Sequence, residues 1–184
     1  MEHSQFCEHS VRQRIEGKWI AKRVGLILLY AFLPLLFTLV GLAQKNFLPF
    51  LVVALLIDLP LYLVTWRRTR VEYEYSMTGG LLVFSLVYGG SARKTVFEQE
   101  LRSIEAAFPY GSEKGQKRLT DYAPEVQYFA LATQSEEENA GKEIWCCLFE
   151  NDDGKHAAFY FELTDTAYRF LRLYAGTVTA PRQG

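Results

Sequence analysis

Two long apolar runs follow each other in the first third of the chain. Residues 24–43 contain no charged side chain, and residues 47–66 contain one, Asp58. A helix rises about 1.5 Å per residue, so roughly twenty apolar residues suffice to cross about 30 Å of bilayer hydrocarbon. Only residues 44–46 separate the runs, and three residues are enough only for a tight turn. The pattern therefore predicts a transmembrane helical hairpin over residues 24–66.

Beyond residue 70 the apolar positions recur with period two. In residues 71–77 the valine, tyrosines and methionine fall on one face and the glutamates and serine on the other, which is typical of a strand with one exposed face. Six further strands are predicted between glycine-rich or polar turns, at residues 81–88, 94–98, 102–108, 126–133, 143–150 and 155–162. Residues 112–125 are polar without a period, so we expect a long loop there.

The period changes again after the last predicted strand. Thr164 or Asp165 can cap a helix, and the apolar residues that follow recur at i, i+3, i+4 and i+7 (Ala167, Phe170, Leu171 and Tyr174). Seven strands in meander order leave an open barrel, and the apolar face of one helix can close its end. This count and order resemble the pleckstrin-homology (PH) superfold.

These patterns divide the chain into four parts. They are a cytoplasmic leader at residues 1–23, the hairpin at 24–66 with helices at 24–43 and 47–66, a cytoplasmic PH-like domain at 70–176 and a tail at 177–184. We expect the leader to be mobile or helical. The expected fold class is an α+β membrane protein, in which a two-helix transmembrane hairpin precedes a PH-like, seven-stranded antiparallel barrel or sandwich with a C-terminal helix.

The net charge of −1 hides an uneven distribution. Residues 1–70 hold nine lysines or arginines against four acidic residues, whereas residues 71–184 hold eleven against seventeen, a net charge of −6. Affinity for nucleic acid comes mainly from lysine and arginine on phosphates. The acidic C-terminal part is therefore a poor candidate for binding nucleic acid.

The basic residues near the hairpin set its expected orientation. Before and after the two runs lie eight of them: Arg12, Arg14, Lys18, Lys22, Arg23, Arg67, Arg68 and Arg70. The connecting loop has only Lys45. Positive residues concentrate on the cytoplasmic side of membrane proteins, so both termini are predicted to be cytoplasmic in a multi-pass protein of the cell membrane.

A cleaved signal peptide is the main alternative for the first run. Gly41 and Ala43 offer small residues at the spacing that a signal peptidase prefers. However, the apolar stretch is longer than the usual 7 to 15 residues, and 23 residues precede it. A permanent anchor is the favoured interpretation.

Asp58 is the candidate functional residue within the membrane. It lies near the middle of the second run, where acidic side chains are costly and often functional, for instance in proton relays or subunit contacts. The favoured interpretation is nevertheless a satisfied structural residue, protonated and hydrogen-bonded within the hairpin or to a second copy. Thr38 and Tyr30 are the possible partners in the hairpin.

Catalytic and metal-binding motifs are lacking. The predicted domain has a single histidine, His156, and no nucleophile with a base beside it, so no catalytic residue, no cofactor and no enzymatic activity are expected. His3, Cys7 and His9 could ligate a metal, but without a fourth ligand we favour no metal site. An odd number of cysteines, two of them adjacent, suits a reducing compartment.

Three short segments carry a resemblance to a known family. Residues 71–75 read VEYEY, residues 78–81 read TGGL and residues 104–109 read IEAAFP. With the hairpin and the C-terminal Pro-Arg, they resemble a family of uncharacterised small membrane proteins of low-GC Gram-positive bacteria. The resemblance implies a bacterial PH-like domain and transfers no catalytic residue. The third strand keeps only Arg93 and Lys94 of the several basic residues usual in that family, which weakens an anionic-ligand interpretation.

These observations favour a non-catalytic interaction or scaffold module, anchored on the cytoplasmic face of the membrane. A protein partner or a homo-oligomer is preferred over a lipid headgroup, since residues 77–80 of the first hairpin carry no basic side chain and the domain is acidic. The alternative function is an accessory subunit of a membrane transporter or another membrane complex that uses the hairpin and Asp58.

Overall fold

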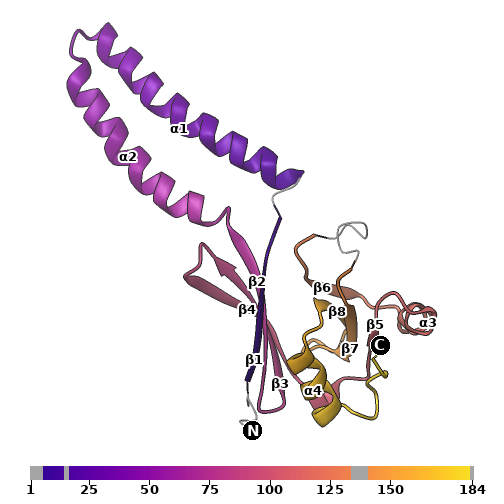
Figure 1. The fold of residues 1–184 in the computed structure, drawn as a ribbon. Helices are drawn as coiled ribbons and strands as arrows, with labels where there is room; N and C mark the ends of the chain where they lie inside the picture. Colours follow the sequence, from indigo (N-terminus) through magenta and orange to yellow (C-terminus); the bar gives the residue numbers. More distant parts are fainter. Residues whose placement is uncertain (1–5, 15–16, 134–140, 183–184) are drawn as a thin grey trace. The chain divides into compact units, whose positions relative to one another are not determined.

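The structure of the chain, a computed structural model, describes residues 6–14, 17–133 and 141–182. It divides into two compact units (Figure 1). The unit that we call the hairpin contains the two long helices and, from the turn between two strands, residues 88–92. The other unit, called here the two-sheet domain, contains the rest of the described strands and the short helices. Each unit is described by itself.

The hairpin consists of α1, Lys18–Ala43, and α2, Phe47–Arg67. Their segments Ile20–Ala43 and Phe47–Trp66 are long and apolar enough to cross a membrane. Most of their leucines, valines and phenylalanines are exposed, whereas a helix of this composition in a soluble protein would be buried. The predicted hairpin of apolar helices is confirmed, although α1 begins six residues before the predicted start.

Small residues allow the two helices to approach closely near their connecting turn. Gly41 is buried, and a Cβ atom there would lie 2.7 Å from the Cα atom of Phe47, closer than real contacts allow. Ala54 of α2 is fully buried. Close backbone approach at small residues is how membrane helices gain packing energy without a hydrophobic driving force.

The first sheet has four strands in the order β1-β2-β3-β4. The strands are β1 (Phe6–Arg12), β2 (Val71–Thr78), β3 (Leu81–Tyr88) and β4 (Ala92–Glu100). β1 runs antiparallel to β2, with Phe6 opposite Thr78 and Arg12 opposite Glu72. The hairpin is therefore inserted between two paired strands.

The prediction of a mobile or helical leader is wrong for residues 6–12. Cys7 and Val11 of β1 are buried, and partly buried His9 lies between them in the alternation. Only two apolar side chains mark the inner face of this strand, and Phe6 belongs to the other face. The period-two signal is therefore too weak to read without the partner strand β2, which lies some sixty residues further along the chain.

The second sheet has the order β5-β7-β8-β6. Its strands are β5 (Ala106–Pro109), β6 (Val126–Ala130), β7 (Ile144–Glu150) and β8 (His156–Glu162), and the short 3-10 helix η1 (Leu101–Ser103) precedes β5. β6 pairs in parallel with β8. The two sheets thus hold eight described strands instead of seven, and their order is not a meander, because the connection after β5 carries the chain to the opposite edge of the sheet.

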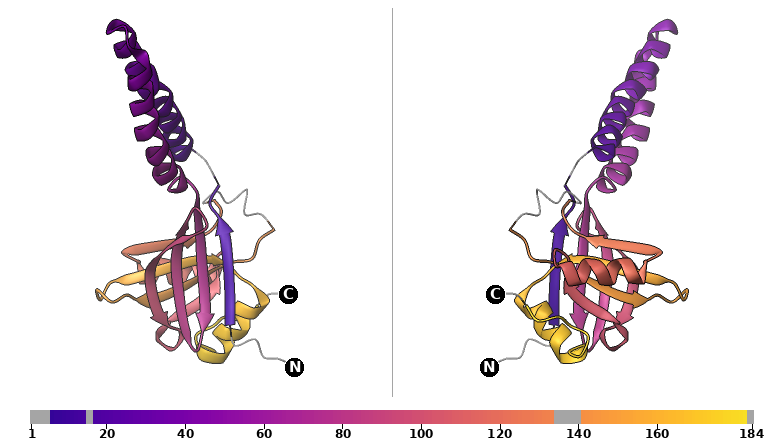
Figure 2. Two further views of the ribbon diagram at one scale, coloured as in Figure 1. Left: turned by 90° about the vertical axis from the view of Figure 1, so that its left-hand side faces the viewer. Right: turned by 90° about the vertical axis from the view of Figure 1, so that its right-hand side faces the viewer.

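That connection contains α3, Glu113–Tyr122, where a loop was predicted. The loop prediction is wrong. Only one residue in each turn of α3 faces the sheet (Gly115, Leu119 and Tyr122), so the sequence shows few apolar positions from which a helical period could be recognised. Ser112 caps the helix by accepting a hydrogen bond from the Gly115 backbone N–H, at 3.1 Å. The helix α3 lies over the second sheet (Figure 2, right), and its side chains Leu119 and Tyr122 pack against the cluster of buried residues on the outer face of that sheet. Both faces of this sheet are therefore covered, which explains why residues 144–149 of β7 and residues 157–161 of β8 are all apolar.

The last helix, α4, spans Asp165–Tyr174 and confirms the prediction. The Thr164 side chain accepts a hydrogen bond from the Ala167 backbone N–H, at 3.1 Å. Phe170 and Leu171 are buried in the main core, which joins the inner faces of both sheets. At the centre of that core, the ring of Phe159 packs against the rings of Tyr75, Phe84, Phe97 and Phe161.

Candidate functional site

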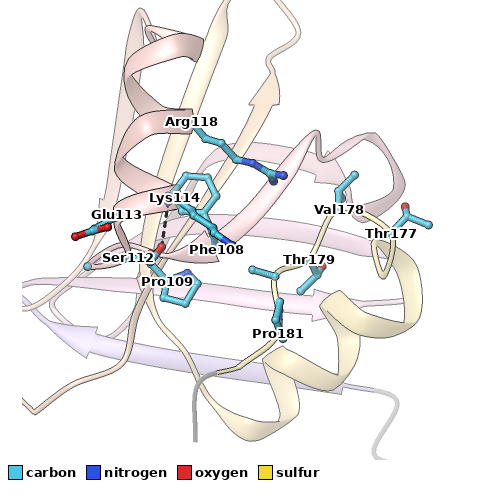
Figure 3. A pocket seen from close by; sticks show the side chains of 13 residues that line it. Phe108, Pro109, Ser112, Glu113, Lys114, Arg118, Thr177, Val178, Thr179 and Pro181 are labelled. Atoms are coloured by element: carbon cyan, nitrogen blue, oxygen red, sulfur yellow. Dashed lines mark hydrogen bonds between the residues drawn. The ribbon is translucent and has the colours of Figure 1, made fainter.

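A groove follows α3 along one side of the two-sheet domain. Its larger part, about 690 Å³, lies between the first turns of α3 and the C-terminal residues 177–181 (Figure 3). A smaller part of about 400 Å³ continues toward Tyr122. Arg118, Thr177 and Val178 line both parts, so the two form one surface. We call it the α3 groove.

Gly115 sets how closely α3 approaches the sheet. A Cβ atom at this position would overlap the Phe108 ring and would lie 2.9 Å from the Pro109 carbonyl oxygen. Ser112 fixes the helix start by donating its hydroxyl to that same carbonyl oxygen, at 2.8 Å. The floor of the groove at Phe108 and Pro109 is thus held against the helix that forms its wall.

The opposite wall is the segment after α4, which was expected to be a tail. Its backbone pairs with the free edge of β5: the Ala107 N–H donates to the Val178 carbonyl at 3.1 Å, and the Ala180 N–H donates to the Ala107 carbonyl at 2.7 Å. Thr179 is buried and donates its hydroxyl to the Ala175 carbonyl, at 2.7 Å. The segment therefore covers an edge that would otherwise be open to another strand.

Arg182 anchors the end of this segment. Its guanidinium donates to Glu143 at 2.7 Å and also bonds the Asp165 carboxylate, while its backbone N–H donates to the Tyr168 hydroxyl at 3.1 Å. The hydrogen bond and the charge of Arg182 hold the pKa of Asp165 below its ordinary value. The C-terminal arginine thus has a structural role.

Two cations face the α3 groove. Lys114 and Arg118 point from α3 into the space beside residues 177–181 (Figure 3). Neither side chain has an ion pair within the part of the chain that the structure describes. Glu113 also lines the larger part, and Glu105 and Asp121 line the smaller part. The groove therefore has a basic centre with acidic residues at its ends.

At the end of the groove where Glu105 and Asp121 lie, the rings of Tyr122 and His156 are stacked. Tyr122 donates its hydroxyl to Glu105 at 3.0 Å, and burial together with this carboxylate raises the pKa of Tyr122. His156 stacks on the Tyr122 ring at 4.3 Å between centroids, and its Nδ1 atom lies 3.1 Å from the Tyr122 carbonyl oxygen. His156 is thereby held as a structural residue.

The cysteines are buried and poorly placed for nucleophilic chemistry. Cys7, Cys146 and Cys147 are free thiols within the two-sheet domain. Burial raises the pKa of Cys146 to about 12 and raises that of Cys147 well above its ordinary value. Cys7 contacts the Thr164 hydroxyl at 3.6 Å. Among the described residues no group of three metal-ligating side chains occurs, and His3 lies outside those residues.

Asp58 lies partly buried on α2 within the hairpin. Its Oδ1 atom is buried and has no hydrogen-bond partner among the described residues. Thr38 donates to the Pro34 carbonyl at 2.7 Å, and Tyr30 bonds Thr65. Neither Thr38 nor Tyr30, the possible partners within the hairpin, is hydrogen-bonded to Asp58 among the described residues.

The basic residues that flank the runs take different places. Arg12 belongs to β1 and pairs with Glu72 at 3.0 Å. Arg23 donates to the Thr69 carbonyl at 3.0 Å and lies over the Trp66 ring, 5.7 Å from its centroid, which ties the start of α1 to the end of α2. The other six lie in the first two turns of α1, at the end of α2 or beside them: Arg14, Lys18, Lys22, Arg67, Arg68 and Arg70.

Arg93 is bound by carboxylates of its own domain. It lies 2.6 Å from Glu74 of β2 and 3.7 Å from Glu8 of β1. Burial raises the pKa of Glu74, the neighbouring Glu8 raises it further, and Arg93 opposes both effects. This arginine is therefore not free to recruit an external anion.

Replacing Arg93 by glutamine should destabilise the domain by about 1–2 kcal/mol at pH 7, less than a fully buried pair because the arginine is half exposed. The pKa of Glu74 is raised, so this residue favours the fold below its ordinary pKa and loses that contribution as the pH rises through its folded pKa. The Arg93→Gln loss should therefore shrink near pH 4.

Denaturant unfolding of the full chain in detergent at the two pH values measures this effect. Lys94→Gln is the matched control, because Lys94 is an exposed neighbour on β4 without an ion pair among the described residues. Equal losses at both pH values, or an equal loss in the control, would contradict the role assigned to Arg93.

Two packed sheets whose core is completed by a C-terminal helix, with an apolar hairpin between the first two strands, define a membrane-associated PH-like protein. The chain belongs to the family described as bacterial PH-like domain (DUF6106), whose model matches residues 3–178. The bacterial PH-like domain that the resemblance in the sequence implies is thereby confirmed. Comparisons with curated proteins and with solved structures returned no match. PH-like domains are in general non-catalytic.

The sequence does not reveal the α3 groove, because the helix that forms one wall lies in a stretch whose pattern predicts a loop. Three signals for a helix were present: Ser112 as an N-cap, Leu119 and Tyr122 three positions apart, and Pro124 just beyond the end. The opposite wall comes from residues 177–181, far along the chain. No motif spacing connects the two walls.

Proposed function

We propose that the protein is a non-catalytic interaction module, anchored in the membrane by α1 and α2, whose PH-like domain works on the cytoplasmic face. One observation carries this proposal. β1 ends just before the hairpin, β2 begins just after it, and the two strands pair along the whole of β1. Both ends of the hairpin must then lie on one side of the membrane, which requires two crossings and not one.

The same pairing argues against a cleaved signal peptide. Cleavage near Ala43 would remove β1 from the domain and expose the surfaces that Cys7 and Val11 cover. It would also turn β2 into an edge strand, because the side of β2 that pairs with β1 would have no neighbour. The family match beginning at residue 3 is consistent with a retained N-terminus.

The distribution of charge supports a cytoplasmic domain. Eight basic residues flank the apolar runs, and the turn between the helices carries Lys45 alone. Free cysteines without a disulfide suit the same compartment. We therefore place both termini in the cytoplasm and the 44–46 turn outside.

A protein partner or a second copy is favoured over a lipid headgroup. The turn between β2 and β3, residues 79–80, is two glycines, and Arg93 of β4 is already paired with Glu74. Phosphoinositide-type binding needs a cluster of basic residues, and anionic membranes repel an acidic domain.

Crosslinking in native membranes tests the proposal. Cells that express the tagged full chain are treated with a short membrane-permeant crosslinker, and the chain is purified under denaturing conditions. We expect a discrete adduct, either with one protein or with a second copy. Recovery of monomers alone over a range of crosslinker concentrations would contradict an interaction module.

A second candidate function rests on Asp58. In the part of the chain that the structure describes, the buried Oδ1 atom of Asp58 has no hydrogen-bond partner, which is costly in the middle of an apolar helix, and such residues serve proton relays or contacts within membrane complexes. An accessory subunit of a transporter would use it in this way. Two helices rarely enclose a pathway alone, so partner helices are required.

Asp58→Asn keeps the shape of the side chain and removes its charge and proton. The interaction module predicts unchanged insertion and an unchanged crosslinking pattern for this variant. The transporter subunit predicts loss of proton-coupled uptake in vesicles prepared from cells with the variant, with the protein still present in the membrane.

A further inference from the structure

We propose that the α3 groove binds a short acidic peptide segment of a partner protein, in which a carboxylate side chain stands next to apolar side chains. This inference rests on the proposed function of the protein as an interaction module. It names the surface that meets the partner and the chemistry that the partner presents.

The first argument is the unpaired charge. Residues 71–184 carry a net charge of −6, and four cations of the two-sheet domain, Arg12, Arg93, Lys142 and Arg182, each already pair with a carboxylate. Lys114 and Arg118 face the groove without an ion pair within the described residues. Such cations are electrostatically complementary to an external carboxylate.

The second argument is the surface around these cations. Phe108, Pro109 and Val178 provide apolar contact area on the floor and the far wall. Arg118 lies where the two parts of the groove meet, and its planar guanidinium matches a carboxylate in a bidentate geometry. A ligand with one acidic side chain and apolar neighbours would satisfy both features.

The third argument is the size of the groove. The ten residues of α3 are about 15 Å long, and an extended peptide advances about 3.3 Å per residue. Four or five residues of a partner would therefore lie alongside the helix. A volume of about 690 Å³ is in the range of ligand sites that bury several side chains.

The acidic residues at the ends of the groove select against polyanions. Glu113 on one side and Asp121 on the other offset the charges of Lys114 and Arg118. A nucleic acid or a multiply phosphorylated headgroup would meet these carboxylates and would be repelled. One or two carboxylates on an apolar peptide fit the local charge better than a dense anion does.

Peptide selection on the intact protein tests the inference. The full chain is placed in nanodiscs and used to select from a displayed library of random seven-residue peptides. Enriched peptides are expected to contain at least one Glu or Asp beside an apolar residue. Their glutamine or asparagine counterparts should bind at least about tenfold more weakly, since a charge-assisted bond to Arg118 is lost.

Charge-reversal variants locate the binding site. Lys114→Glu with Arg118→Glu should weaken the selected peptides at least about tenfold, and Lys114→Gln with Arg118→Gln should weaken them in the same direction. Lys155→Glu is the matched control, because Lys155 is an exposed lysine in the turn between β7 and β8. Both cations of the groove are exposed, so folding should tolerate the changes.

Several outcomes would overturn the inference. They are no enrichment of acidic sequences, equal binding of the amide counterparts, or equal loss in Lys155→Glu. Binding of vesicles containing phosphatidylglycerol that is lost in the Lys114/Arg118 variants would assign the groove to lipid instead. If the in-cell crosslinked partner persists in these variants, the groove assignment fails while the proposed function stands.

Discussion

Deletion of residues 1–13, which carry β1, should unfold the PH-like domain even though the hairpin and all later strands remain. β1 contributes the buried side chains of Cys7 and Val11 and pairs with β2 over seven residues. Its loss also removes the contact of Cys7 with Thr164, the N-cap of α4. A domain is stable by only about 5–15 kcal/mol, so losing an entire strand exceeds what it can tolerate.

Limited proteolysis of membranes that contain the variant measures this result. The deletion should convert the region beyond residue 71 from a resistant fragment into a rapidly digested one. Deletion of residues 1–5 is the control, since it ends before β1 and should leave the fragment intact. A resistant fragment in the longer deletion would show that residues 6–12 are dispensable, as a cleavable leader would be.

Phe159→Ala should destabilise the domain by about 3–5 kcal/mol. Phe159 of β8 is fully buried, and its ring contacts Tyr75, Phe84 and Phe97 of the opposite sheet. The rigid aromatic neighbours cannot collapse into the space that the ring leaves, so the lost contacts and the cavity both count. This prediction tests whether the two sheets share one core.

Denaturant unfolding of the detergent-solubilised full chain, followed by near-ultraviolet circular dichroism, gives the change in free energy. Leu173→Ala is the matched control, because Leu173 of α4 is 73% exposed and its truncation should change stability by less than about 0.5 kcal/mol. Similar small losses for both variants would show that the sheets do not pack as described.

The sequence predicts the elements whose pattern is local and leaves out what depends on distant partners. The hairpin, β2, β3, β7, β8 and α4 each have a run length or a period that needs no neighbour to interpret. β1 has two inward apolar residues, and only pairing with β2 across the hairpin makes it a strand. The parallel pairing of β6 with β8 leaves no local signal, which is why a meander was expected.

The α3 groove and Asp58 likewise depend on contacts between residues that are far apart in the chain. The α3 groove joins residues 108–118 to residues 177–181, and the register of these segments is fixed by Gly115 and by the pairing of Ala107 with Val178 and Ala180. Asp58 can be placed on the second apolar run from sequence alone. That its Oδ1 atom has no hydrogen-bond partner among the described residues could not be foreseen, because the packing of α1 on α2 places the Tyr30 hydroxyl against Thr65.

The insertion of the hairpin between paired strands changes how the anchor is understood. A domain that merely follows a membrane helix is tethered at one point. Here the chain enters the hairpin from β1 and returns into β2, and Arg12 pairs with Glu72 where these strands meet. In the membrane topology that we propose, folding of the first sheet requires both segments in one compartment, so the topology of the hairpin is part of the fold.

Cysteine accessibility in intact cells tests this topology most directly. Lys45→Cys, in the turn between α1 and α2, and Lys155→Cys, in the turn between β7 and β8, are each treated with a membrane-impermeant maleimide, and the three buried native cysteines serve as the unreactive background. With both termini in the cytoplasm, we expect labelling of Lys45→Cys in intact cells and of Lys155→Cys only after lysis. Labelling of Lys155→Cys in intact cells, or protection of Lys45→Cys until lysis, would contradict it.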